Sequence, residues 1–188
     1  MKKTTLSILI ILGSLLNLYS QNVITVDNSP GANAQFSDLQ TAISNASAGD
    51  ILYVHPSETS YGIIDVDKSL TLIGYSHSSP DKETIVTNIN LGEAASNTRV
   101  SGFHITNDFV IDNPSTTLTG IVFENNKVDD SMVFSNAGVD GIVIRGNVID
   151  YLGTVSNGTT ANVYTNAIIT NNIITTVIYV RFSQSISI

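Results

Sequence analysis

Short apolar runs separated by polar turn-forming residues fill the chain from Asp50 onward. These runs are rich in Val, Ile, Leu and Phe, and the segments between them are rich in Gly, Asn, Ser and Asp. In the runs 132–134 and 142–144, apolar side chains at alternate positions predict an inward pair, such as Met132 and Phe134, around one outward residue, Val133. This pattern is typical of short β-strands and predicts an all-β chain.

Several of these segments are copies of one another. Each holds an apolar residue, a two-residue corner with Gly or Asn, then Phe or Asn, a variable residue and a second apolar residue. The copies are 100–105, 123–128, 144–149 and 169–174. Their fourth positions, Phe103, Asn126, Asn147 and Asn172, are 23, 21 and 25 residues apart. A period in the low twenties, in units too small to bury their own apolar face, predicts a solenoid.

The length of the runs selects the kind of solenoid. Three short strands and three corners fit into each repeat, which is the composition of one turn of a parallel β-helix. The leucine framework and the helical segment of a leucine-rich repeat are missing. We expect Asn126, Asn147 and Asn172 to stack at one corner, with their amides bonded along the axis. Sugar binding by these asparagines is the alternative, but a structural ladder explains their spacing without further assumptions.

One helix is predicted before the strands begin. Phe36, Leu39, Ile43 and Ala46 fall at helical spacing. Ser37 followed three residues later by Gln40 forms a capping-box pattern, and Gly49 is a stop signal, so the helix is expected over about 36–48.

The first twenty residues have the pattern of a secretory signal peptide. Lys2 and Lys3 precede an apolar run, 6–18, which is too short to span a bilayer comfortably, and Ser20 precedes the expected cut. A membrane anchor or a buried helix is the less favoured alternative. We therefore expect a leader at 1–20 and a mature β-helix domain at 21–188, without a stable membrane span, that is secreted, periplasmic or at the cell surface.

Composition narrows the possible partners. The chain has 188 residues, 42% hydrophobic and 13% charged, with eight basic and sixteen acidic side chains and no cysteine. An acidic chain repels nucleic acid and other polyanions unless a cation bridges the two. The absence of cysteine excludes disulfides, thiol catalysis and cysteine-ligated metals.

Three segments resemble a known family. The stretches 36–43, 48–54 and 68–74 are similar to the opening of right-handed parallel β-helix proteins of the pectin-lyase-like superfamily. The resemblance implies a helix that caps the first turn, an asparagine ladder, and a polysaccharide as ligand. Its members include polysaccharide lyases, glycoside hydrolases, pectin esterases, phage tailspikes and adhesins, so the fold alone selects no activity. The segment 56–63 departs from the pectin-esterase pattern.

If the fold is a β-helix, a polysaccharide would lie across successive turns on one sheet. We assign that sheet to 89–91, 109–111, 132–134 and 162–164, with Asn90, Val110 and Val133 facing outward and either Asn162 or Tyr164 beside them.

The basic residues are not placed as a polysaccharide lyase would need them, with an arginine or lysine on the binding sheet. Arg99 and Arg145 fall beside a different strand from the expected binding sheet, and Lys127 and His104 occupy equivalent corner positions one turn apart. Surface charge is the favoured interpretation of these residues.

Four acidic residues gather near the expected sheet: Asp108, Asp112, Asp129 and Asp130. Two carboxylates on neighbouring turns could act as the acid and the nucleophile or base of glycoside hydrolysis. The same oxygens are the ligands that Ca²⁺ prefers, which makes Ca²⁺ the candidate cofactor. Aspartate also caps turns in any loop-rich chain, and that interpretation is favoured.

Two functions follow from these observations. The preferred one is a secreted, noncatalytic β-helix that binds or presents itself to a polysaccharide or cell-surface glycan. The alternative is a polysaccharide lyase or glycoside hydrolase whose site is incomplete or lies downstream. Because 178–188 alternates without a cap, we also expect either a truncated chain or edge-to-edge self-association through the C-terminal coil.

Overall fold

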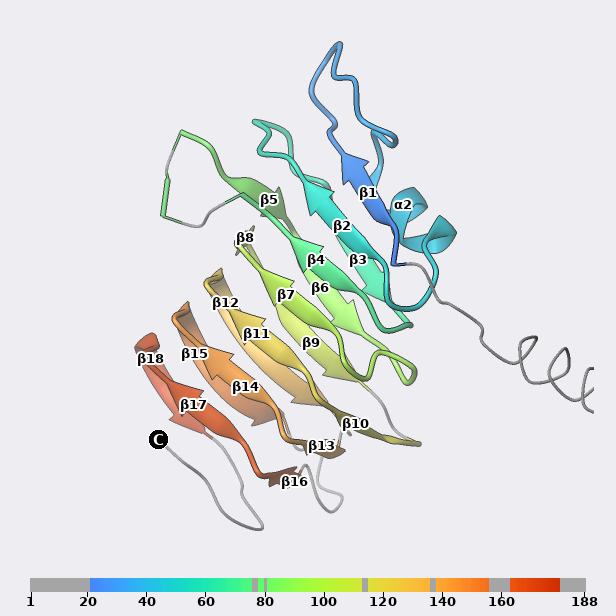
Figure 1. Cartoon of the computed structure of the whole chain (residues 1–188). Coiled ribbons are helices and arrows are strands. Elements are labelled where there is room, and N and C mark those ends of the chain that lie inside the picture. The colour runs from blue at the N-terminus through green and yellow to red at the C-terminus, as the bar shows by residue number, and fades with distance from the viewer. Residues whose placement is uncertain are drawn as a thin grey trace, which may run out of the picture.

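The computed structural model describes residues 21–75, 78–79, 81–112, 115–135, 138–155 and 163–179. They form a parallel β-helix of about five turns with one short helix near its N-terminal end (Figure 1). The predicted fold class is therefore confirmed. The expected leader at 1–20 lies outside the described residues, as do positions 180–188 of the expected C-terminal coil.

Three parallel sheets form the sides of the β-helix. The front sheet has the order β1 (Val23–Val26), β2 (Ile51–Val54), β4 (Thr71–Ile73), β7 (Arg99–Ser101), β11 (Val122–Glu124), β14 (Val143–Arg145) and β17 (Ile168–Thr170). The rear sheet has the order β18 (Ile173–Tyr179), β15 (Val148–Val155), β12 (Lys127–Ser135), β9 (Phe109–Asp112), β6 (Asn88–Leu91) and β3 (Ile63–Val66); β5 (Thr84–Val86) and β8 (Phe103–Ile105) also belong to it. The third sheet holds β10 (Thr117–Thr119), β13 (Gly138–Asp140) and β16 (Val163–Thr165).

The core consists of columns of inward side chains that the strand register stacks. Val100, Phe123 and Ile144 are partners on adjacent strands of the front sheet, and all three are fully buried. The rings of Phe109 and Phe123 lie 4.3 Å apart between their centroids. Apolar burial along these columns is the main stabilising force, since each turn covers the exposed face of the one before.

From the turn of β7 onward, two corners of each turn use a left-handed backbone. At the corner between the front and rear sheets this residue is Gly102, Asn125, Gly146 or Asn171, with φ of 80°, 53°, 65° and 55°. A second series, made up of Asn97, Gly120, Gly141 and Asn166, recurs with the same spacing at the corner that leads into the front sheet. Glycine and asparagine adopt this conformation at the lowest cost, which explains why the repeats hold them there.

The predicted asparagine ladder is present next to the first of these corners. The side-chain oxygen of Asn147 accepts the backbone N–H of Asn126 at 2.9 Å, and Asn172 accepts that of Asn147 at 3.0 Å. The amide of Asn147 also donates to the carbonyl of Phe123 at 3.0 Å. Asn126 and Asn147 are buried, so these bonds satisfy groups that water cannot reach.

The helix is shorter than predicted and is capped differently. Helix α2 spans Leu39–Asn45, with Asp38 as its N-cap, because the Asp38 carboxylate accepts the N–H of Thr41 at 2.6 Å. The helix ends at Asn45, with Ala46 as its C-cap, and does not continue to the expected stop at Gly49. Gln40, expected in the capping box, instead bonds both the N–H and the carbonyl of Asp65, and so covers the open edge of β3.

The expected binding sheet is right in three of its four segments. The register joins β6, β9 and β12, but the next strand is β15. The fourth segment was wrong because β16, which contains Tyr164, pairs with β13 in the third sheet. The prediction passed over the second half of β15, an eight-residue strand in which Tyr151 and Leu152 are the register partners of Ser131 and Met132.

Candidate functional site

The four predicted aspartates lie in different surroundings. Asp108 accepts the N–H of Ser131 at 3.2 Å, and Ser131 donates its hydroxyl to Asp130 at 3.0 Å. Burial raises the pKa of Asp108, the bond from Ser131 lowers it, and the Asp130 charge raises it again, so that the pKa lies above its ordinary value. Asp112 is at the far end of β9 and Asp129 faces a histidine. Among the described residues, no group of three or more His, Cys, Asp or Glu is placed to hold a metal ion.

Asp129 belongs to a chain of hydrogen-bonded ionisable side chains across three turns. His104 contacts the carboxylate of Glu83 through Nδ1 and that of Asp129 through Nε2, both at 2.6 Å. Lys127 also contacts Asp129 at 2.9 Å. Burial raises the pKa of Asp129, but the hydrogen bonds from His104 and Lys127 outweigh it, and the pKa is lowered. The register had suggested His104 beside Lys127, whereas Glu83 was missed because it comes from a loop.

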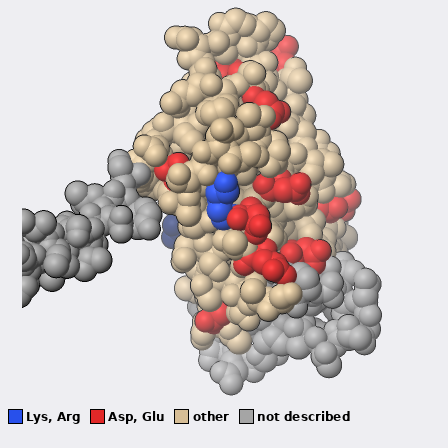
Figure 2. Space-filling model, turned by 90° about the vertical axis from the view of Figure 1, so that its right-hand side faces the viewer, with Lys and Arg blue, Asp and Glu red and all other residues tan. Residues whose placement is uncertain are grey.

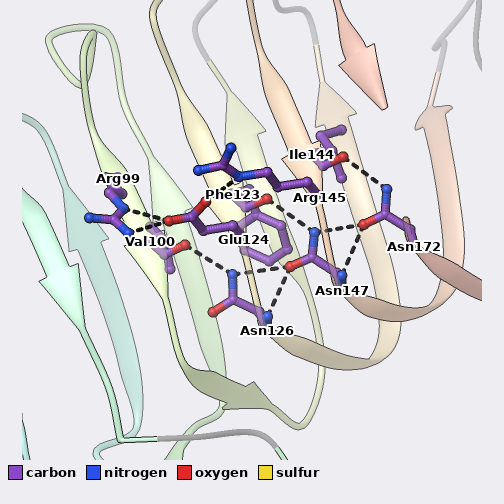
Figure 3. A network of polar contacts seen from close by, with 9 residues as sticks. All are labelled: Arg99, Val100, Phe123, Glu124, Asn126, Ile144, Arg145, Asn147 and Asn172. Carbon is purple, nitrogen blue, oxygen red and sulfur yellow. Dashed lines mark hydrogen bonds and ion pairs between the residues drawn. The ribbon is translucent and has the colours of Figure 1, made fainter. Parts of the chain in front are cut away.

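A second ion network lies on the front sheet. Glu124 accepts hydrogen bonds from Arg99, with 2.7 Å between Nε and Oε1, and from Arg145 on the opposite side (Figure 3). Its side chain is only 3% exposed, because the two arginines cover it. Burial raises the pKa of Glu124, the bonds from Arg145 and Arg99 lower it more, and the carboxylate is held ionised. Both arginines are surface side chains, as the sequence suggested, and the structure adds that both pair with Glu124.

The rear sheet carries a shallow acidic groove of about 430 Å³. Asp65, Asp67 and Asp112 line it together with Asn90 and Val110, two of the residues predicted to face outward there. Asp65 and Asp67 already accept bonds, from Asn90 at 2.8 Å and from the N–H of Ala94 at 2.9 Å. Acidic side chains also outnumber basic ones on the face at the right of Figure 1 (Figure 2).

A long loop interrupts the repeat between β4 and β5. In the next turn Gly102 alone separates β7 from β8, whereas residues 74–83 separate β4 from β5. Thr84, after this loop, pairs with Phe103 and is fully buried. Its hydroxyl donates to the carbonyl of Val54 at 3.1 Å and accepts the N–H of Tyr75 at 2.9 Å. Thr84 therefore fixes the start of the loop to the body of the β-helix.

A groove of about 240 Å³ lies where this loop leaves the front sheet. We call it the tyrosine groove: it is lined by Tyr53, His55, Pro56, Ile73, Gly74 and Tyr75, with Val54. Tyr53 is 43% exposed and Tyr75 is 57% exposed. Tyr53 and Ile73 are partners on adjacent strands, so this side of the groove is part of the sheet.

A polar pocket of about 480 Å³ adjoins the tyrosine groove at Pro56. We call it the carboxylate pocket: it is lined by Glu58, Asp81, Lys82 and Glu83 among others. Its walls are cross-linked, because Ser57 donates its N–H to the carbonyl of Glu83 at 3.1 Å and Asn28 donates its amide to that of Thr59 at 3.0 Å. Lys82 reaches back over the ring of Tyr75, with 5.9 Å between Nζ and the centroid.

The two hollows together offer the contacts that a sugar chain needs. Exposed aromatic rings pack against the apolar faces of a ligand, while hydroxyl, carboxylate and ammonium groups bond its polar edges. The spacing of 28 residues between Leu72 and Val100, against 21 to 25 in the later repeats, was the one sequence signal of a loop here. The sequence did not show which of its side chains line a hollow.

No family model, curated protein or solved structure matches the chain. In the part of the chain that the structure describes, no helix has the length and apolar character to cross a membrane.

Proposed function

We propose that this chain is a secreted, noncatalytic β-helix of the pectin-lyase-like type that binds a polysaccharide in the tyrosine groove. The observation that carries the proposal is the pair of exposed rings, Tyr53 and Tyr75, in one groove on a rigid sheet. Two exposed rings in one groove offer apolar faces on which sugar rings stack.

A polymer fits this site better than a small ligand. The tyrosine groove and the carboxylate pocket share Pro56, so a ligand with several rings spans both. Stacking on Tyr53 and Tyr75 needs no particular charge, and the pocket supplies hydrogen-bonding groups for hydroxyls. The helix cap and the asparagine ladder agree with what the resemblance to the superfamily implies, and the pattern at 1–20 supports secretion.

A glycan-binding panel tests this proposal. The secreted chain is titrated calorimetrically with neutral, acidic and amine-bearing oligosaccharides. We expect binding to at least one, weakened about tenfold or more by Tyr75→Ala, since a central aromatic contact contributes about 2 kcal/mol. Ile63→Ala is the matched control, because Ile63 is also exposed but lies on the rear sheet. Failure of every oligosaccharide to bind, or an equal loss in the control, would contradict the proposal.

Hydrolysis of a glycoside is the second candidate. The observation in its favour is Asp108, whose raised pKa suits a general acid and whose neighbour on the next turn is the carboxylate of Asp130. Release of reducing ends from the same panel, measured with and without Ca²⁺ and abolished by Asp108→Asn, would favour it over simple binding.

A further inference from the structure

We infer that the side chain of Lys82 is a movable cover of the glycan site, which lies over Tyr75 in the free protein and leaves it when a glycan binds. This inference rests on the proposed function and adds to it a means by which the affinity of the same site is regulated. Three features carry it: the place of Lys82 between the two hollows, the fixed backbone on both sides of it, and the carboxylates that receive its ammonium group.

Lys82 lies at the junction that a bound polymer would cross. It lines the carboxylate pocket, whereas its Nζ lies over the ring of Tyr75 in the tyrosine groove, 5.9 Å from the centroid. This distance is within the range of a cation–π contact. A sugar ring that stacks on that face of Tyr75 needs the space that the ammonium group occupies. The two contacts therefore exclude each other.

The backbone around this contact is held, so that only the side chain of Lys82 has to move. The N–H of Tyr75 is bonded to the body of the β-helix. The N–H of Lys82 donates to the carbonyl of Ser79 at 2.9 Å, and the next carbonyl along the chain, that of Glu83, accepts the N–H of Ser57 at 3.1 Å. The side chain of Lys82 is exposed. An exposed side chain changes rotamer faster than a loop rearranges, so the cover opens without a change in the fold.

The displaced ammonium group has a second favourable position. Glu58 and Asp81 line the same pocket as Lys82 and are exposed. Their carboxylates attract a cation that leaves the ring, so the movement exchanges one weak contact for another. A cation–π contact at an exposed site is itself weak, which allows a neutral ligand to displace it.

The cover lowers the affinity according to the fraction of molecules in which it is open. The apparent dissociation constant of such a site is the intrinsic constant divided by that fraction. An exposed lysine above a tyrosine ring should therefore weaken glycan binding about threefold. Removal of the ammonium group should tighten binding, whereas removal of a group that bonds the glycan would weaken it.

Substitutions of Lys82 test the sign of the effect. Each variant is titrated calorimetrically with a neutral β-linked glucose hexamer, or with the oligosaccharide of the panel that binds most tightly if that is another. Lys82→Gln removes the charge and should bind about threefold more tightly than the unchanged protein. Lys82→Arg should bind more weakly, because a guanidinium group stacks on an aromatic ring better than an ammonium group does.

Lys68 provides the matched control. Lys68→Gln removes the same charge from a lysine that lines neither hollow and whose ammonium group donates to the carbonyl of Ile43 at 3.1 Å. This variant should leave the affinity unchanged. Thermal unfolding of each variant shows that the fold is intact.

Nuclear magnetic resonance observes the contact directly. The ring current of Tyr75 should displace the resonances of the Lys82 ε-methylene protons upfield in the free protein, and saturation with the oligosaccharide should remove this displacement. Lys82→Gln assigns these resonances by their disappearance. The corresponding resonances of Lys68 should not respond to the oligosaccharide.

The outcomes separate the inference from the proposed function. Weaker or unchanged binding by Lys82→Gln overturns the inference and leaves the proposed function standing. The same holds if the free protein shows no ring-current displacement, or if the displacement persists in the complex. If no oligosaccharide of the panel binds, the proposed function fails and the inference fails with it.

Discussion

The corner between β11 and β12 consists of Asn125 and Asn126, whereas the corresponding corner between β4 and β5 spans residues 74–83. The later corner is closed, with the side chain of Asn126 buried in the ladder. The earlier corner is open, and its first exposed residue is Tyr75. One structural position therefore serves stability in the regular turns, and where a loop interrupts the repeat it opens into the groove that we propose as the glycan site.

The regular corner should be the more sensitive of the two to substitution. Asn147→Ala removes the acceptor for the N–H of Asn126 and the donor to the carbonyl of Phe123. Because both groups are buried, we expect a loss of about 3 kcal/mol in the free energy of unfolding. Urea denaturation measures it. The exposed Asn33 is the control, and Asn33→Ala should change stability by less than about 0.5 kcal/mol. Equal effects of the two substitutions would argue against the ladder.

Substitution of two glycines separates the cost of backbone strain from the cost of a steric clash with a neighbouring turn. Gly102 and Gly141 both have positive φ, 80° and 69°. A Cβ on Gly102 would lie 2.6 Å from the carbonyl oxygen of Gly74, whereas one on Gly141 would meet no atom within 4 Å. We expect Gly141→Ala to cost about 1 kcal/mol, from strain alone, and Gly102→Ala about 2 kcal/mol. Because Gly74 lines the tyrosine groove, the second change should also weaken glycan binding.

Thr84 anchors the open corner to the body of the β-helix. Thr84→Val keeps the shape but leaves the N–H of Tyr75 and the carbonyl of Val54 without their partner. A loss of about 1 kcal/mol in stability is expected, with a several-fold lower glycan affinity because Tyr75 is no longer fixed. Thr84→Ser retains the hydroxyl and should restore most of both. An affinity unchanged in Thr84→Val would mean that this anchor does not position the ring.

The ion network on the front sheet should give the smallest effect, and one that depends on pH. The folded-state pKa of Glu124 lies below its ordinary value of 4.5. Its contribution is therefore present above that pH and is lost as the pH falls through the folded-state pKa. At neutral pH, Glu124→Gln should cost less than about 1 kcal/mol, and the difference should vanish in acid, where both side chains are neutral. A difference that grew in acid would contradict the assignment.

The sequence was sufficient to predict the β-helix and the ladder because these follow from local repeats, whereas the helix was predicted too long and with the wrong cap. The alternation around Met132 corresponds to the inward and outward faces of one strand. The spacing of Asn126 and Asn147 corresponds to the length of one turn. The pairing of Glu124 with Arg99 depends on the register between turns, and the pairing of Glu83 with His104 depends also on the path of the loop before β5. The fourth segment of the binding sheet was wrong because β15 continues past the Asn147 corner to Val155, and no sequence feature marked those residues as part of that sheet.

The central claim is that the loop at 74–83 makes the binding site and that the β-helix does not need it. Gly74 and Thr84 lie close together, because a Cβ on Gly74 would be 3.0 Å from that of Thr84. Excising residues 75–83 would join them and reproduce the short corner between β7 and β8. Titration of this variant with the best glycan of the panel, beside urea unfolding, is the most direct measurement. Cooperative unfolding with binding abolished is the predicted result, and a folded variant that binds as tightly as the unchanged protein would contradict it.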